Sequence, residues 1–114
     1  MLDRRSHERL PLDCRVLLTR IDQDSRPIED QDKVACLGKD VSRGGICFSH
    51  SYPLDCRRFL LSFHDAKVGH GVVEAEVAWT RIIGTSFHET GCRITRKLVV
   101  PPSLAAQKPS RQAS

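Results

Sequence analysis

The sequence predicts an all-β protein, a small antiparallel barrel or sandwich of about six strands. Short apolar segments alternate with polar turns that contain glycine or proline, and no stretch shows the period of an amphipathic helix. A chain of 114 residues can build one modest core but not two. We therefore expect a β-barrel domain over residues 12–98, between a flexible arm (1–11) and a disordered tail (99–114).

Each strand is expected where apolar side chains alternate or cluster. The clearest case is the fifth, where Val73, Ala75, Val77 and Trp79 alternate with Glu74, Glu76, Ala78 and Thr80, as in a strand with one wet face. Gly44 and Gly45 turn the chain into the third strand, and Gly84 lies in the turn before the sixth. In order, the expected strands are residues 14–19, 34–40, 46–48, 59–63, 73–80 and 87–94.

The two ends lack the patterns of folded elements. Residues 1–11 are rich in arginine and have no apolar period, so we expect a flexible arm. Three prolines lie between residues 101 and 114, which favours disorder, although residues 103–107 could form one helical turn. The polar, acidic segment 22–33 is expected to form a long hairpin loop.

The composition indicates the cellular compartment and the kind of partner. Five cysteines, an odd number without a CxxC pair, favour reduced structural thiols and a cytoplasmic location. No apolar run is long enough for a membrane span or a signal peptide. The net charge of +4 favours an anionic partner, and thirteen arginines against five lysines favour bidentate recognition of phosphate or guanine.

Two short motifs together have the chemistry that a guanine nucleotide requires. Arg5 and Arg9 are four residues apart, and either guanidinium could pair with phosphate or with O6 and N7 of guanine. The carboxylate of Asp40 suits the N1–H and N2–H donors of the Watson–Crick edge. Ser42 and a tight turn at Gly45 could supply a hydroxyl and backbone N–H groups to phosphate, and glycine would permit a positive φ or close approach of a ligand.

These motifs, in this order and ahead of suitable strands, resemble those of the PilZ domain family over residues 4–96. The resemblance implies a six-stranded antiparallel split barrel that binds bis-(3′→5′)-cyclic dimeric GMP (cyclic di-GMP), a bacterial second messenger. It implies that the RxxxR motif at Arg5 and Arg9 and the DxSxxG motif at Asp40, Ser42 and Gly45 bind this ligand. The protein would be a stand-alone receptor, not an enzyme, and would need no cofactor.

The resemblance implies further details of binding and signalling. Arg4 precedes the first motif, and an arginine there in similar domains is associated with two intercalated ligand molecules. Arg43, Gly44 and Trp79 are candidates for additional contacts. The arm would become ordered over the barrel when the ligand binds, and the new surface would signal to a partner protein.

Other interpretations stay open at this stage. The arginines could belong to a solvated arm, Asp40 to an ordinary turn, and Trp79 to the core or its rim. The chain could be a ligand-independent adaptor or a barrel that binds single-stranded nucleic acid, although only 5% of its residues are aromatic. The spacing of the histidines indicates no metal site, and no nucleophile elbow, P-loop or metalloprotease motif is present.

Overall fold

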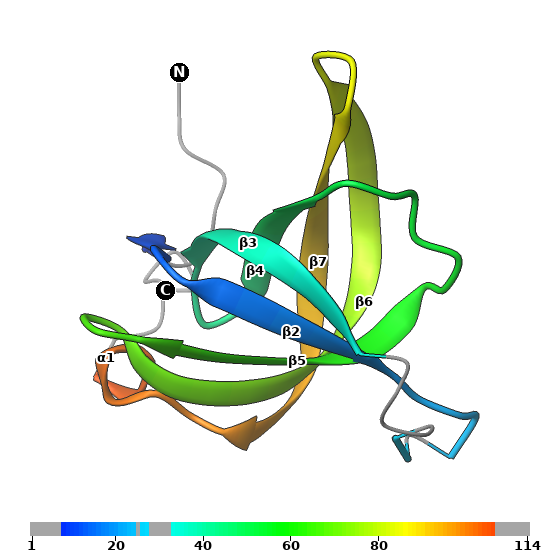
Figure 1. Ribbon diagram of the computed structural model, residues 1–114. Helices are drawn as coiled ribbons and strands as arrows, with labels where there is room; N and C mark the ends of the chain where they lie inside the picture. The colour runs from blue at the N-terminus through cyan, green and yellow to red at the C-terminus, as the bar shows by residue number, and fades with distance from the viewer. Residues whose placement is uncertain (1–7, 25, 28–32, 107–114) are drawn as a thin grey trace, which may run out of the picture.

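The computed structural model describes residues 8–24, 26–27 and 33–106, which form seven strands and one short helix (Figure 1). The elements are β1 (Leu10–Pro11), β2 (Arg15–Arg20), β3 (Val34–Val41), β4 (Gly45–His50), β5 (Arg58–Asp65), β6 (Gly69–Ile83), β7 (Phe87–Val99) and α1 (Pro102–Ala105).

Six of the strands close into an antiparallel barrel. Their order is β3-β2-β5-β6-β7-β4, and β4 pairs back with β3 to complete the ring. The two-residue strand β1 adds to β3 outside this ring, with Leu10 opposite Val41 and Pro11 opposite Asp40. The structure confirms the predicted all-β barrel, and closure leaves few sheet edges exposed.

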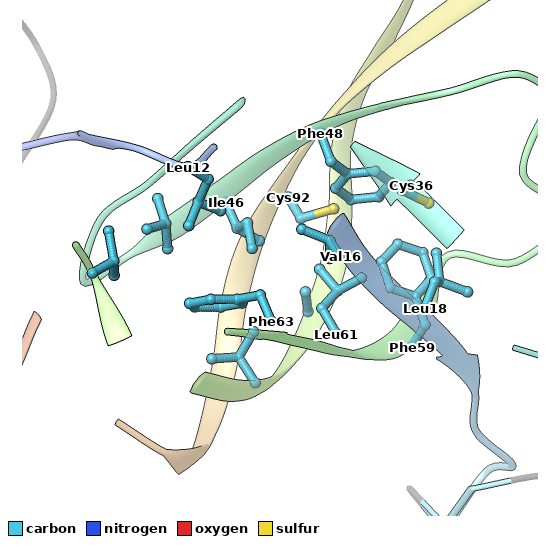
Figure 2. Close-up of a cluster of buried hydrophobic side chains, with 14 of the residues drawn as sticks. Leu12, Val16, Leu18, Cys36, Ile46, Phe48, Phe59, Leu61, Phe63 and Cys92 are labelled. Carbon is cyan, nitrogen blue, oxygen red and sulfur yellow. The ribbon is translucent and has the colours of Figure 1, made fainter. Parts of the chain in front are cut away.

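Alternate side chains of the strands fill the barrel interior (Figure 2). Phe48 and Phe59 are fully buried and meet edge to face, with ring centroids 6.1 Å apart. Aliphatic side chains from several strands complete the core, chiefly Val16, Leu18, Ile46, Leu61 and Val73. This interior fixes the barrel, and polar side chains on its outer surface remain available for binding.

A long hairpin of β6 and β7 projects beyond the barrel (Figure 1). Its turn contains Gly84 at φ +65°, a conformation that favours glycine. Both strands are longer than the sequence predicts. β6 has a bulge between Val77, which faces Cys92, and Trp79, which faces Gly91. The extra residue moves Trp79 off the face that Val73 and Val77 share, so its predicted place on that alternating face is wrong.

The structure differs from the expected arm and tail where it describes them. Leu10 and Pro11 are paired in β1, although they belong to the segment expected to be flexible. The predicted disordered tail starts at residue 99, yet Pro101 and Leu104 are buried and α1 begins at Pro102. Proline suits the first turn of a helix, and Leu104 then packs against the barrel. Residues 1–7 and 107–114 lie outside the described range.

Candidate functional site

The turn between β3 and β4 is built around the side chain of Ser42. Its buried hydroxyl accepts hydrogen bonds from the N–H groups of Gly44 and Gly45, at 3.3 and 3.2 Å. The N–H of Ser42 donates to the carbonyl of Gly45 at 2.8 Å. Two backbone N–H groups that the sequence suggested for phosphate binding are therefore used within the turn. The Ser42 side chain thus stabilises the turn through hydrogen bonds within the loop itself.

Arg9 and Asp40, from the two motifs, form an ion pair beside this turn. Nη1 of Arg9 lies 3.1 Å from Oδ1 of Asp40, and the two side chains are 26% and 24% exposed. The pairing of β1 with β3 places Arg9 here, because Pro11 lies opposite Asp40. Both of these atoms are buried, and the contact lacks hydrogen-bond geometry. The two groups attract each other without a directed hydrogen bond between these atoms.

Gly45 lies directly beneath the guanidinium of Arg9. A Cβ atom at Gly45 would be 3.0 Å from the carbonyl oxygen of Cys92 and 3.9 Å from both Nη atoms of Arg9. Positive φ is found at Gly69 and Gly84, not at Gly45. Of the two reasons that the sequence offered for glycine at this position, positive φ does not apply, and close approach of neighbouring atoms does.

A single cross-strand row connects Asp40 to Trp79 on the outer surface of the barrel. Asp40 of β3 lies opposite Cys47 of β4, Cys47 opposite Gly91 of β7, and Gly91 opposite Trp79 of β6. Ile46 and Phe48, the neighbours of Cys47, point into the core, so this row points outward. The site is therefore an outer face of four adjacent strands.

Trp79 lies across Gly91 and is 43% exposed. A Cβ atom at Gly91 would be only 2.3 to 2.5 Å from three indole atoms, so the ring rests directly on the glycine backbone. The guanidinium carbon of Arg81 lies 5.7 Å from the ring centroid, within the range of a cation–π contact. The indole thus covers part of the outer face and keeps part of its surface accessible.

Glu89 anchors two cations next to the indole. It is 2% exposed, and its carboxylate accepts hydrogen bonds from Lys39 and, at 2.7 Å, from Nε of Arg81. The hydrogen bond from Lys39 and the nearby guanidinium lower the pKa of Glu89, although burial opposes the shift. Glu89 therefore stays ionised and holds both cations on the outer face.

Cys47 lies within the same row but is not a reactive thiol. Burial raises its pKa to about 11, and the nearby carboxylates of Glu89 and Asp40 add to the shift. Burial likewise raises the pKa of Cys92 to about 12. All five cysteines are free, and these two side chains serve as small apolar groups.

The structure brings together most of the predicted site residues that it describes. Arg9, Asp40, Ser42 and Gly45 adjoin one another, and Arg43 and Gly44 belong to the same turn. Trp79 lies along the same row of the sheet. Arg4 and Arg5 lie outside the described residues.

Sequence reasoning missed the residues that support the outer face. Lys39, Arg81, Glu89 and Gly91 gain their roles from pairing between strands distant in sequence. The alternation of residues 73–80 did not indicate the bulge that moves Trp79 to the opposite face of the strand. A glycine opposite the tryptophan in the expected hairpin was the one usable signal for a ring lying on the backbone.

We also searched the described residues for a metal site, a membrane-spanning helix and a second pocket. No group of three or more His, Cys, Asp or Glu side chains among them could hold a metal ion. Within the same ranges, no helix is long and apolar enough to cross a membrane. A pocket of about 1070 Å³ lies between the β1–β2 segment, the β5–β6 turn and α1, and none of the predicted site residues lines it.

Comparison with known proteins identifies the fold. No protein-family model and no curated protein sequence matches the chain. The structure is similar to that of the Bacillus subtilis inhibitor of motility MotI/DgrA, with a TM-score of 0.64 and 13% identity over 86% of this chain and 46% of that one. It is similar to the K. pneumonia MrkH–c-di-GMP complex, with a TM-score of 0.57 and 16% identity over 83% and 46% of the two chains.

A third similar structure is the PilZ domain of YcgR from Escherichia coli with c-di-GMP. Its TM-score is 0.54, at 17% identity over 90% of this chain and 83% of that one. The chain spans about half the length of MotI/DgrA and MrkH. The TM-scores establish a common fold, and at these low identities the ligand must be argued from the residues. The chain therefore has the fold of the PilZ domain.

Proposed function

We propose that this protein is a cyclic di-GMP receptor that binds its ligand on the outer face around Arg9 and Asp40. The observation that supports the proposal most strongly is the ion pair between these two residues, which belong to motifs about thirty positions apart. Ser42 and Gly45 complete the second motif next to that pair. MrkH and YcgR, which share the fold, are known in complex with c-di-GMP.

The chemistry of the pair matches the two edges of guanine. The Arg9 guanidinium can donate to O6 and N7 or to phosphate, and the Asp40 carboxylate can accept from N1–H and N2–H. Because the present contact lacks hydrogen-bond geometry, ligand atoms would replace it with directed bonds. We propose that Arg5, which lies outside the described residues, contributes a second guanidinium.

Trp79 extends the proposed site along the outer face. Its exposed indole surface can stack on a purine, an interaction that contributes about 1–3 kcal/mol per base. Lys39 and Arg81, held by Glu89, add positive charge beside it. Arg43 and Gly44, in the turn, are further candidates for phosphate contact.

Three finer features belong to the same proposal. We infer that Arg4 permits two ligand molecules per chain, because its guanidinium could stack on a further base. Binding would order the part of the 1–11 segment that precedes β1. The resulting surface would signal to a partner protein, so the chain acts as a sensor and adaptor without catalysis.

Calorimetric titration with cyclic di-GMP tests the assignment. The variants Arg5→Ala, Arg9→Ala and Asp40→Ala are each expected to weaken binding at least about tenfold, the loss of one charged hydrogen bond. The Arg20–Asp55 ion pair, at 2.8 Å, provides matched controls: Arg20→Ala and Asp55→Ala should bind like the wild type. Unchanged binding in all three site variants would refute the site, and no binding by the wild-type protein would refute the function.

The same titrations test the finer features. A stoichiometry near two that falls to one in Arg4→Ala would support the role of Arg4, and one ligand per wild-type chain would reject it. Affinity should decrease as salt increases, because guanidinium–phosphate attraction is screened. A single-stranded oligonucleotide that displaces cyclic di-GMP would instead support a nucleic-acid-binding barrel.

A further inference from the structure

The hairpin of β5 and β6 brings two histidines together on the outer surface of the barrel. His64 lies opposite His70, next to the pair of Asp65 and Gly69 that borders the turn. Residues directly opposite each other in antiparallel strands point to the same side of the sheet. Both histidines are exposed, whereas Phe63 and Asp65 on either side of His64 are buried. The two imidazole rings therefore point outward together.

Neither imidazole of this pair is used for a contact within the protein other than the one between the rings. The ring centroids of His64 and His70 are 5.5 Å apart, and the ring planes differ by 28°. Within the described residues, neither ring has a hydrogen-bond or ion-pair partner. Each neutral imidazole therefore keeps one ring nitrogen whose lone pair can bind an external group.

A second pair of stacked histidines differs in this respect. His50 and His88 lie opposite each other on β4 and β7, with ring centroids 5.4 Å apart. Nδ1 of His50 lies 2.6 Å from the carbonyl oxygen of Tyr52, and Nε2 lies 2.6 Å from the hydroxyl of Thr90. Both ring nitrogens of His50 are thus used within the protein, so this pair can offer only one ligand to an ion.

We propose that His64 and His70 together bind one divalent transition-metal ion, such as Zn²⁺, Ni²⁺ or Cu²⁺, with water completing its coordination. A tetrahedral ion bound to two imidazole nitrogens at about 2.0–2.1 Å holds the ring centroids about 5.2 Å apart. The observed 5.5 Å is close to this value, and rotation of the exposed rings can direct one nitrogen of each toward a shared ion. The spacing of the histidines in the sequence did not indicate this site, because only the hairpin register brings the two together.

The available donor atoms determine the class of metal. A groove of about 300 Å³ lies beside the two imidazoles, and none of the described residues that line it has a carboxylate. Mg²⁺ and Ca²⁺ prefer oxygen ligands, whereas imidazole suits Zn²⁺, Ni²⁺ and Cu²⁺. Arg15 also lines the groove, and its positive charge opposes the binding of a cation. Affinity must therefore come from the two nitrogens, and Cu²⁺ should bind most tightly.

A metal ion bound here would join β5 to β6 beside their turn. On its inner side the turn is already stabilised by Asp65, whose carboxylate accepts hydrogen bonds from the N–H groups of Lys67 and Val68 at 2.8 and 2.9 Å. Because folding brings the two imidazoles together, the ion should bind the folded chain more tightly than the unfolded one. At a free-metal concentration about ten times the dissociation constant, the ratio of folded to unfolded protein should increase about elevenfold.

Calorimetric titration of the full chain, without an affinity tag, with NiCl₂ tests the proposal. We expect one Ni²⁺ per chain, and His64→Ala and His70→Ala should each weaken binding at least about tenfold, because each removes one of two ligands. His88→Ala removes a histidine from the other stacked pair, so this matched control should bind Ni²⁺ like the wild type. MgCl₂ should give no heat of binding.

Urea unfolding in the presence and absence of Ni²⁺ gives a second measurement. The ion should raise the urea midpoint of the wild type and of His88→Ala, but not that of His64→Ala or His70→Ala. Circular dichroism establishes that each variant is folded. Binding of cyclic di-GMP should not change in His64→Ala, because the proposed ligand site lies at the β3–β4 turn and beside Trp79.

Three results would overturn the proposal. The first is a wild-type chain that does not bind Ni²⁺. The second is binding that persists in both His64→Ala and His70→Ala, which would assign the ion to other groups, such as the free cysteines. The third is a stoichiometry of half an ion per chain, which would assign it to a contact between two copies.

Discussion

The contact between Trp79 and Gly91 predicts that Gly91→Ala destabilises the wild-type protein but stabilises a variant without the Trp79 side chain. In Gly91→Ala, the added methyl would lie 2.3 Å from Cε2 of the indole, whereas carbon atoms in contact are usually about 3.5–4.0 Å apart. The ring must therefore move outward by more than about 1 Å. It can do so because it is 43% exposed, but it would lose packing and its contact with Arg81.

The magnitude follows from the buried part of the ring. Somewhat over half of the Trp79 surface is buried, about 100 Å², which is equivalent to about 2.5 kcal/mol at about 25 cal/mol per Å². Displacement should lose about half of this, roughly 1–2 kcal/mol with the cation–π contribution included. In a Trp79→Ala background the same change should instead stabilise the protein by about 0.5–1 kcal/mol, because alanine suits a strand better than glycine.

Urea unfolding of the wild type, both single variants and the double variant measures this coupling. Trp79 is the only tryptophan in the chain, so a red shift of its emission in Gly91→Ala would report the displaced ring directly. The displaced ring should also weaken cyclic di-GMP binding if it stacks on a base. An equal effect of Gly91→Ala in both backgrounds, with unchanged emission, would refute the argument.

Three further predictions concern other positions. Glu89→Gln should cost about 1–3 kcal/mol at neutral pH, and because the pKa of Glu89 is lowered, the difference from the wild type in urea unfolding should shrink as pH falls below about 4.5. Burial lowers the pKa of His50, so the free energy of unfolding should be highest above pH about 6.5 and should decrease as the pH falls below that value. Urea unfolding at several pH values should show a shallower decrease in His50→Gln. Gly45→Val should weaken calorimetric cyclic di-GMP binding at least about tenfold, because its side chain would press on the Cys92 carbonyl and on Arg9.

The fold was largely predictable because alternating side chains reveal strands. Each expected strand lies within or close to an observed one, including the short third strand around Cys47. The outward face of Trp79 was not predictable, since one bulge at Val77 reverses the side of every residue that follows. One helical turn over residues 103–107 was predicted and α1 lies at 102–105, but its packing against the barrel was not predicted, because the prolines at 101 and 102 indicated a disordered tail.

The candidate site was predictable only in its motifs. The spacing of the DxSxxG residues follows from a local turn, in which Ser42 binds the N–H groups of Gly44 and Gly45. The meeting of Arg9 with Asp40 depends instead on the pairing of β1 with β3, which no local pattern specifies. Lys39 and Arg81 converge on Glu89 for the same reason, through pairing of distant strands.

On the proposed function, the geometry of Arg9 bears on the response to the ligand. Arg9 immediately precedes β1, whose Leu10 pairs with Val41, so the barrel itself positions this guanidinium. Asp40 holds it at 3.1 Å without hydrogen-bond geometry, so on the proposed function a ligand would replace an undirected attraction. A guanidinium already positioned loses less conformational entropy on binding than a free one. On the proposed function, Arg9 and Asp40 thus supply a preformed half of the site, and the response to ligand must depend on the residues before Arg9.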